Sequence, residues 1–260
     1  MHIVLSTPPD LLREASCHGQ PVAHMAYRIG EGFHLYRSAV PLSMRGGVMV
    51  VADGGYTGDG DTSVLTGEIM REYGNRGFEG ILLDFGAPSP SLHAAASMLS
   101  MRLGRVGGTL YLPERYAQDS DWCKVLIPTA LSGGSLSARL REAASFYGAQ
   151  RIALEIERVR MDFRLPAYDG EGTRLTAEAF ARLTALHKQQ AYFSQELCAY
   201  YFTFKDKDGS HFVVYDDAGS IRKKLYLAER LDIKDAVLLY PEISDLFPAD
   251  PQSEDSPIPN

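Results

Sequence analysis

The sequence lacks the features that mark several classes of protein. It has only three cysteines in 260 residues, Cys17, Cys123 and Cys198, and they form no C-x-x-C pair. This argues against a disulfide framework and a structural zinc site, and it favours a reducing compartment. No stretch approaches 18 uninterrupted apolar residues, so no membrane span is predicted.

A surplus of positive charge is also missing. The chain has 26 lysines and arginines against 33 aspartates and glutamates, for a net charge of −7. Neither nucleic acid nor an anionic membrane surface is therefore expected as a partner. Residues 1–9 hold a short apolar run without a basic leader or a small-residue cleavage site, which is typical of a first strand rather than a signal peptide. A cytoplasmic location is expected.

What is present indicates one folded domain. Hydrophobic residues make up 45% of the chain and charged residues 23%, ordinary values for a soluble globular protein. The length suits a single α/β barrel of about 250 residues. We expect this domain to span residues 1–247. Residues 248–260 are rich in Pro, Asp and Ser and have little to bury, so a flexible C-terminal tail is expected there.

Short apolar runs alternate with helical patterns along the chain. Candidate strands lie at 2–6, 24–29, 48–53, 80–85, 109–113, 124–129, 151–157 and 236–240, and apolar residues recur with helical spacing at 63–73, 91–103, 136–147 and 220–231. Such alternation implies a parallel sheet with helices outside it. Eight units favour a (β/α)8 TIM barrel over the alternative, an open doubly wound sheet. Residues 200–215, with Asp208-Gly209 as the turn, predict a small β-hairpin inserted between strands 7 and 8.

Three segments resemble glycoside hydrolase family 18, the chitinase-like barrels. Residues 214–221 read V-Y-D-D-A-G-S-I, with lysines following at 223 and 224, as in a late segment of that family. Residues 234–240 resemble its last strand. Residues 74–86, G-N-R-G-F-E-G-I-L-L-D-F-G, have the frame of its signature fourth strand. The resemblance runs from about residue 48 to about residue 246 and implies a TIM barrel without a cofactor.

The signature strand departs from the family at its catalytic positions. The family pattern is Asp-x-x-Asp-x-Asp-x-Glu, and the corresponding residues here are Glu79, Leu82, Asp84 and Gly86. The resemblance implies that the final glutamate is the general acid and that the aspartate beside it orients the substrate's own N-acetyl group, which is the nucleophile in such enzymes. A glycine can donate no proton, so only Asp84 is retained unchanged.

Two other family positions have changed as well. Ala130 stands where the family has a tyrosine that holds the acetamido carbonyl, and Tyr240 replaces the tryptophan that forms the floor of the sugar site. These changes favour a catalytically degenerate barrel that binds glycan oligomers of the N-acetylglucosamine type, or a structural protein, inside the cell or in a spore layer. The alternative is an active glycoside hydrolase with relocated carboxylates, drawn from Glu155, Glu157, Glu114 and Asp84.

The remaining candidate residues follow from strand geometry. Side chains alternate across a strand, so Glu155 and Glu157 are expected to point into the barrel, where they either pair with Arg158 or Arg160 or contact a ligand.

Three residues are expected at the rim of the site: Asp53 and Tyr56 after the third strand, and Glu114 after the fifth. No metal is expected, because no histidines show ligand spacing. Trp122, the single tryptophan, is expected in the core.

Overall fold

A computed structural model describes residues 1–40, 44–56, 58, 60–86, 88–118, 120–131, 133–167, 172–187, 190–207 and 209–247. The predicted tail, residues 248–260, and the turn residue Asp208 lie outside this described part of the chain. No helix in the described part is both long enough and apolar enough to cross a membrane.

Eight parallel strands form a closed barrel, as predicted, and the open-sheet alternative is wrong. The strand order is β1-β14-β8-β7-β6-β5-β4-β2, with β1 also paired to β2, and β3 (Leu35–Arg37) is added antiparallel to β2. The barrel strands are β1 (His2–Thr7), β2 (Val22–Ile29), β4 (Val48–Ala52), β5 (Gly80–Asp84), β6 (Thr109–Pro113), β7 (Lys124–Pro128), β8 (Ile152–Ile156) and β14 (Asp235–Leu239).

The chain divides into two compact units, each considered by itself below. One consists of His2–Leu126 together with the end of the chain from Val237, and the other is formed by Met1 and Ile127–Ala236. The first unit holds the helices α1 (Leu12–Ser16), α2 (Thr62–Arg76), α3 (Pro90–Val106) and α7 (Tyr240–Ile243). The second holds α4 (Leu136–Tyr147), α5 (Ala177–His187) and α6 (Ala218–Glu229).

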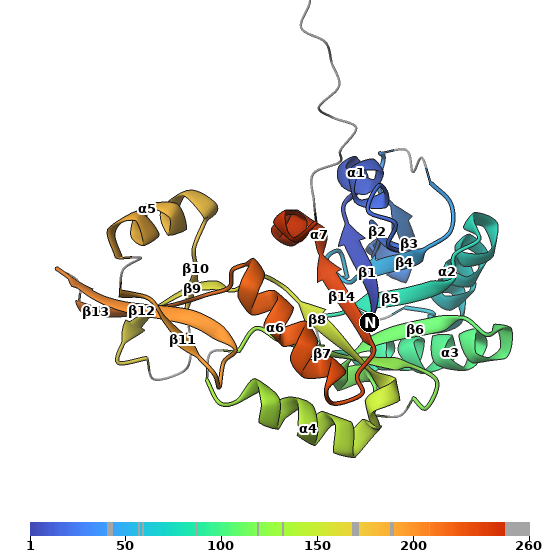
Figure 1. Cartoon of the computed structure of the whole chain (residues 1–260). Coiled ribbons are helices and arrows are strands. Elements are labelled where there is room, and N and C mark those ends of the chain that lie inside the picture. Colours follow the sequence, from blue (N-terminus) through green and yellow to red (C-terminus); the bar gives the residue numbers. More distant parts are fainter. Residues whose placement is uncertain are drawn as a thin grey trace, which may run out of the picture. The chain divides into compact units, whose positions relative to one another are not determined.

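Local sequence explains where the long helices of the first unit begin and end. Asp61 caps α2 by accepting the N–H groups of Ser63 and Val64, and Ser89 caps α3, where Pro90 takes the first helical position. Gly77 and Gly107 end these two helices in the left-handed conformation. Figure 1 shows α2 and α3 outside strands β4, β5 and β6.

Strand β5 illustrates how the barrel core is built. Ile81 and Leu83 are fully buried, and Leu82, which points to the opposite face of the strand, is only 5% exposed. Apolar residues on both faces are typical of a parallel strand covered on both sides. The strand ends at Asp84, which is its last residue and is accessible to solvent.

The insertion between β8 and β14 is larger than the predicted small hairpin. It is a five-stranded antiparallel sheet in the order β10-β9-β13-β12-β11. Its strands are β9 (Arg160–Leu165), β10 (Thr173–Arg174), β11 (Tyr192–Ser194), β12 (Ala199–Asp206) and β13 (Gly209–Tyr215). The expected hairpin segment supplies β12 and β13, which pair from Tyr200↔Tyr215 to Asp206↔Gly209. Helix α5 packs on this sheet through Phe180, which contacts Tyr215, and His187, which stacks on Phe204.

Candidate functional site

Two aspartates meet where β4 and β5 end. Asp84 is the last residue of β5, and Asp53 directly follows Ala52, the last residue of β4. The two aspartates lie close together because Ala52 pairs with Asp84 in the parallel register. The backbone N–H of Asp53 donates to the carbonyl oxygen of Asp84 at 3.2 Å. Protein around the Asp84 carboxyl group raises its pKa by desolvation, and the charge of Asp53 raises it further, although solvent still reaches the side chain. The site therefore offers a carboxyl group that holds its proton to higher pH than an ordinary aspartate.

Position 86, two residues beyond Asp84, carries no functional group. Arg115 Nη1 donates to the carbonyl oxygen of Gly86 at 2.6 Å, which ties this backbone to the segment after β6. A Cβ built on Gly86 would meet no atom within 4 Å, and the residue is not in the left-handed region. A larger side chain at this position would therefore enter open space without backbone strain.

Aromatic and hydroxyl groups connect the loop after β4 to the start of α3. The backbone N–H of Tyr56 donates to the carbonyl oxygen of Asp53 at 2.8 Å, and its phenol oxygen lies 2.7 Å from Ser89 Oγ. Phe33 packs edge-on against the Tyr56 ring at 5.6 Å. Burial, followed by the charge of Asp53, raises the pKa of the neighbouring Tyr116 phenol. Asp53 thus lies beside Asp84, and Tyr56 connects Asp53 to Ser89 at the start of α3.

Glu114 begins the short helix Glu114–Tyr116 directly after β6 and is half-buried. The sequence predicted this position at the strand's carboxyl end. Its carbonyl oxygen accepts the N–H of Ala117 at 3.1 Å.

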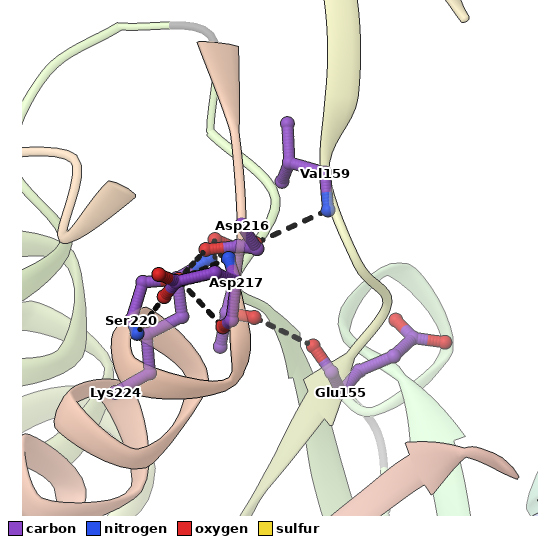
Figure 2. Close-up of polar contacts among 7 residues, drawn as sticks. Glu155, Val159, Asp216, Asp217, Ser220 and Lys224 are labelled. Carbon is purple, nitrogen blue, oxygen red and sulfur yellow. Dashed lines mark hydrogen bonds and ion pairs between the residues drawn. The ribbon is translucent and has the colours of Figure 1, made fainter. Parts of the chain in front are cut away.

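A second polar cluster lies in the other unit, around Asp216 (Figure 2). Lys224 Nζ lies 2.7 Å from Asp216 Oδ2, and its side chain is completely buried. Ser220 Oγ donates to Asp216 Oδ1 at 2.7 Å, and the N–H of Val159 donates to Oδ2 at 3.1 Å. Lys224 also donates to the carbonyl oxygen of Thr129 at 3.3 Å. Through Val159 and Thr129, the cluster links α6 to the backbone after β8 and after β7.

The cluster explains the late segment 214–221 that resembles family 18. Asp217 caps α6 by accepting the N–H of Ser220, and Ser220 Oγ accepts the N–H of Asp217 in return. Of the two lysines that follow, Lys224 makes the buried pair, whereas Lys223 lies over the Phe193 ring at 3.7 Å. The likeness in this segment is therefore one of architecture.

No protein-family model and no curated protein matches this chain. Solved structures do. A chitinase from Chromobacterium violaceum is 16% identical with a TM-score of 0.68, covering 95% of this chain and 96% of its own. The fold is that of a chitinase. The spore cortex-lytic enzyme SleL of Bacillus megaterium is 15% identical with a TM-score of 0.64, covering 95% of this chain and 74% of its own. A family GH18 chitinase of Cycas revoluta is 12% identical with a TM-score of 0.62, covering 94% and 96%.

In this chitinase-like barrel, Tyr240 does not form the expected open floor for a sugar. It is the first residue of α7, and only 1% of it is exposed. Its hydroxyl group donates to Glu14 Oε1 at 2.8 Å and lies 2.9 Å from His18 Nε2. Phe247 stacks on His18 and lies 6.3 Å from the Tyr240 ring. The expectation that Tyr240 offers an aromatic face to substrate is wrong, because neighbours from the start and the end of the chain enclose the ring.

The two glutamates that were expected on one strand, Glu155 and Glu157, have different surroundings in the structure. Glu155 is half-buried, and its carbonyl oxygen accepts the Thr129 N–H at 3.0 Å and the Thr129 hydroxyl at 3.2 Å. Figure 2 shows its carboxyl group pointing away from Asp216. Glu157 lies beyond the end of β8, is exposed, and pairs with Arg174 Nη1 at 3.6 Å. The ion pair expected with Arg158 or Arg160 is therefore replaced for Glu157 by one with a residue of β10.

Sequence reasoning missed the residues that shape position 86 and the rim. Arg115 gave no signal, because its partner is a backbone carbonyl 29 residues away. Ser89 could have been found, since Ser-Pro before a helical pattern is typical of a helix start. Among the described residues, no group of three histidine, cysteine, aspartate or glutamate side chains is placed to hold a metal ion.

Proposed function

We propose that this chitinase-like barrel is a non-hydrolytic member of glycoside hydrolase family 18 that binds glycans with N-acetyl groups, such as fragments of chitin or peptidoglycan. The observation that carries the proposal is Gly86. The family resemblance assigns the proton donor to this position, two residues after the retained Asp84, and the position here is a glycine in open space.

Binding is supported by what remains around that position. Asp84 is reached by solvent, so its carboxyl group is available to an acetamido N–H or a sugar hydroxyl. Asp53 raises the pKa of Asp84, and the rim beside them is made of Tyr56 and Ser89. A carboxylate that accepts a hydrogen bond contributes about 1.5–3 kcal/mol, enough to select a ligand without chemistry.

A row of aromatic side chains on the inserted sheet gives further support. Tyr192 and Tyr201 are cross-strand partners with ring centroids 5.9 Å apart, and Phe212 follows at 5.3 Å. Tyr192 is exposed, while Tyr201 and Phe212 are half-buried. Sugar rings present apolar C–H faces to such rings, so this row could contact a glycan chain.

Restoration of the acid is the direct test. In Gly86→Glu, the carboxyl group is placed where the family has its proton donor, and general acid catalysis contributes about 10²–10⁴-fold. We expect the native protein to be silent against a fluorogenic N-acetylglucosaminide and the Gly86→Glu variant, alone or with Leu82→Asp, to hydrolyse it. Gly54→Glu is the matched control, because Gly54 also has nothing within 4 Å of a built Cβ but lies beside Asp53.

Isothermal titration with N-acetylglucosamine oligomers tests binding itself. We expect saturable heat of binding with the native protein. Asp84→Asn should weaken the affinity for the oligomer about tenfold or more. No heat at millimolar oligomer with the folded native protein would contradict the binding role.

One observation favours a second function, an active hydrolase in which Asp84 is the proton donor. Burial and the charge of Asp53 both raise the pKa of Asp84, as catalysis by a general acid near neutral pH requires. In that case native turnover would be lost in Asp84→Asn. In Asp53→Asn the pKa of Asp84 would fall, so the alkaline limb of the pH–rate profile would move to lower pH. If the native protein shows no turnover in the same assay, this second function is excluded.

A further inference from the structure

The only tryptophan of the chain is exposed instead of lying in the predicted core. Trp122 lies just before β7 and is 70% exposed. Its backbone is held in place, because Ser100 Oγ donates to the Trp122 carbonyl oxygen at 3.4 Å. The exposed indole therefore leaves a large apolar surface open to a ligand.

The indole is supported on one side by helix α3. A Cβ built on Gly104 would lie 3.2 Å from Trp122 Cγ and 3.5 Å from Cδ2, so the ring packs directly on the helix at this glycine. Any larger residue at 104 would push the ring outward. One face of the ring thus rests on the helix while most of the side chain remains open to solvent.

Two hollows flank the Trp122 side chain. The larger, about 310 Å³, lies between the end of α3 and the starts of β6 and β7, and includes Thr109 and Lys124 in its lining. The smaller, about 250 Å³, is lined by Met101, Gly104, Arg105 and Trp122. The larger hollow is within the size range of small-ligand sites. Both lie at the amino ends of the barrel strands, whereas Asp84 and Gly86 lie at the carboxyl end of β5 and just beyond it.

Among the described residues that line the two hollows, the charged side chains are Arg105 and Lys124, and both are basic. Asp121 precedes Trp122 in the chain but does not line them. In a chain with a net charge of −7, this local positive charge favours an anionic group on the ligand.

The lining of the two hollows sets the chemistry of the ligand. A ligand that fits has an apolar face for the Trp122 indole and an acidic group for Arg105 and Lys124.

We propose that the Trp122 groove is a second binding site, which takes a pyranose sugar that carries a carboxylate. The sugar ring stacks on the open face of the indole, and Arg105 and Lys124 face the carboxylate. The proposal goes beyond the neutral glycan proposed at Asp84 and does not depend on it.

Fluorescence gives a direct readout, because Trp122 is the only indole in the chain. We expect saturable quenching or a blue shift with a hyaluronan tetrasaccharide, which contains glucuronate, or with N-acetylglucosaminyl-N-acetylmuramic acid, which carries a lactyl carboxylate. Comparison of the two distinguishes the sources of the carboxylate. Chitotetraose, a neutral oligomer, should bind at least about fivefold more weakly, since it lacks the charge that Arg105 and Lys124 attract.

Calorimetry on variants tests the residues named. We expect Trp122→Ala to weaken hyaluronan tetrasaccharide binding about fivefold or more, by analogy with stacking of flat ligands on aromatic residues. Phe146→Ala is the matched control, because Phe146 is 75% exposed on α4. Arg105→Ala should weaken binding at low salt and have less effect at high salt, whereas Arg141→Ala on α4 should have no effect.

Several outcomes would overturn the proposal. The first is an unchanged Trp122 spectrum with both acidic sugars at millimolar concentration. The second is equal binding of an acidic proline-containing peptide, which would assign the groove to a protein partner. The third is emission that changes with protein concentration alone, which would assign it to a second copy. Asp84→Asn should leave this titration unchanged, so loss of neutral glycan binding and loss of this site are separate results.

Discussion

The buried pair of Lys224 and Asp216 should be among the most sensitive positions of the chain. Replacing Lys224 by methionine keeps the apolar stem but removes the ammonium group, and leaves Asp216, which is 2% exposed, without its cation. Breaking a buried ion pair from one side costs about 3–5 kcal/mol. A domain is stable by only about 5–15 kcal/mol, so Lys224→Met should remove a large part of the free energy of unfolding.

The remaining contacts set the size of this effect. Asp216 would keep hydrogen bonds from Ser220 and from the Val159 N–H, which moderate the loss. The double variant Lys224→Met with Asp216→Asn removes both charges and should recover part of the stability, because no uncompensated charge remains buried. Coupling of this kind is what a double-mutant cycle measures.

Urea unfolding followed by circular dichroism is the assay, with the midpoint and slope compared for each variant. Lys223→Met is the matched control, since the neighbouring lysine contacts the Phe193 ring and should cost about 1 kcal/mol or less. Equal midpoints for the two single variants, or a double variant less stable than Lys224→Met, would refute the reasoning.

Three further predictions each concern a single residue. His24 is fully buried and burial lowers its pKa from 6.5 to about 4, so the unfolded chain binds more protons than the folded one between these values. Stability should therefore fall by up to about 3 kcal/mol as the pH drops from 6.5 to 4, and His24→Gln should flatten this dependence in urea titrations at several pH values. Tyr240→Phe loses the hydrogen bond to Glu14 and should lower thermal stability by about 1–3 kcal/mol in calorimetry, while leaving binding of N-acetylglucosamine oligomers unchanged. Ser89→Ala removes the cap of α3 and should cost about 1 kcal/mol in urea unfolding, whereas an unaltered midpoint would mean that the cap contributes nothing.

The barrel could be predicted because its signals are local. The apolar run before Asp84 marks the strand, and Asp84 marks its carboxyl end. The place of Gly86, two residues beyond that end, follows directly from its position in the sequence. Asp53 could be expected near Asp84 for the same reason, since neighbouring parallel strands end at one edge of a sheet.

The rest depended on contacts between residues far apart in the chain. Tyr240 is enclosed by Glu14 and His18, more than 220 residues earlier, and no local pattern indicates that. Glu157 pairs with Arg174, which lies on a strand of two residues that is too short to recognise from sequence. Trp122 was expected inside because large apolar residues usually are, and no local pattern indicates that its ring packs on Gly104 of α3 while most of the side chain stays exposed.

The open space at Gly86 has a consequence for the use of this scaffold. A glycine codon and a glutamate codon can differ by a single nucleotide, and nothing near position 86 has moved in to occupy the place of a side chain. A glutamate side chain at this position would therefore meet no steric barrier. The chain is a starting point for laboratory evolution in which an acidic side chain is introduced by a change at one codon, two residues beyond Asp84.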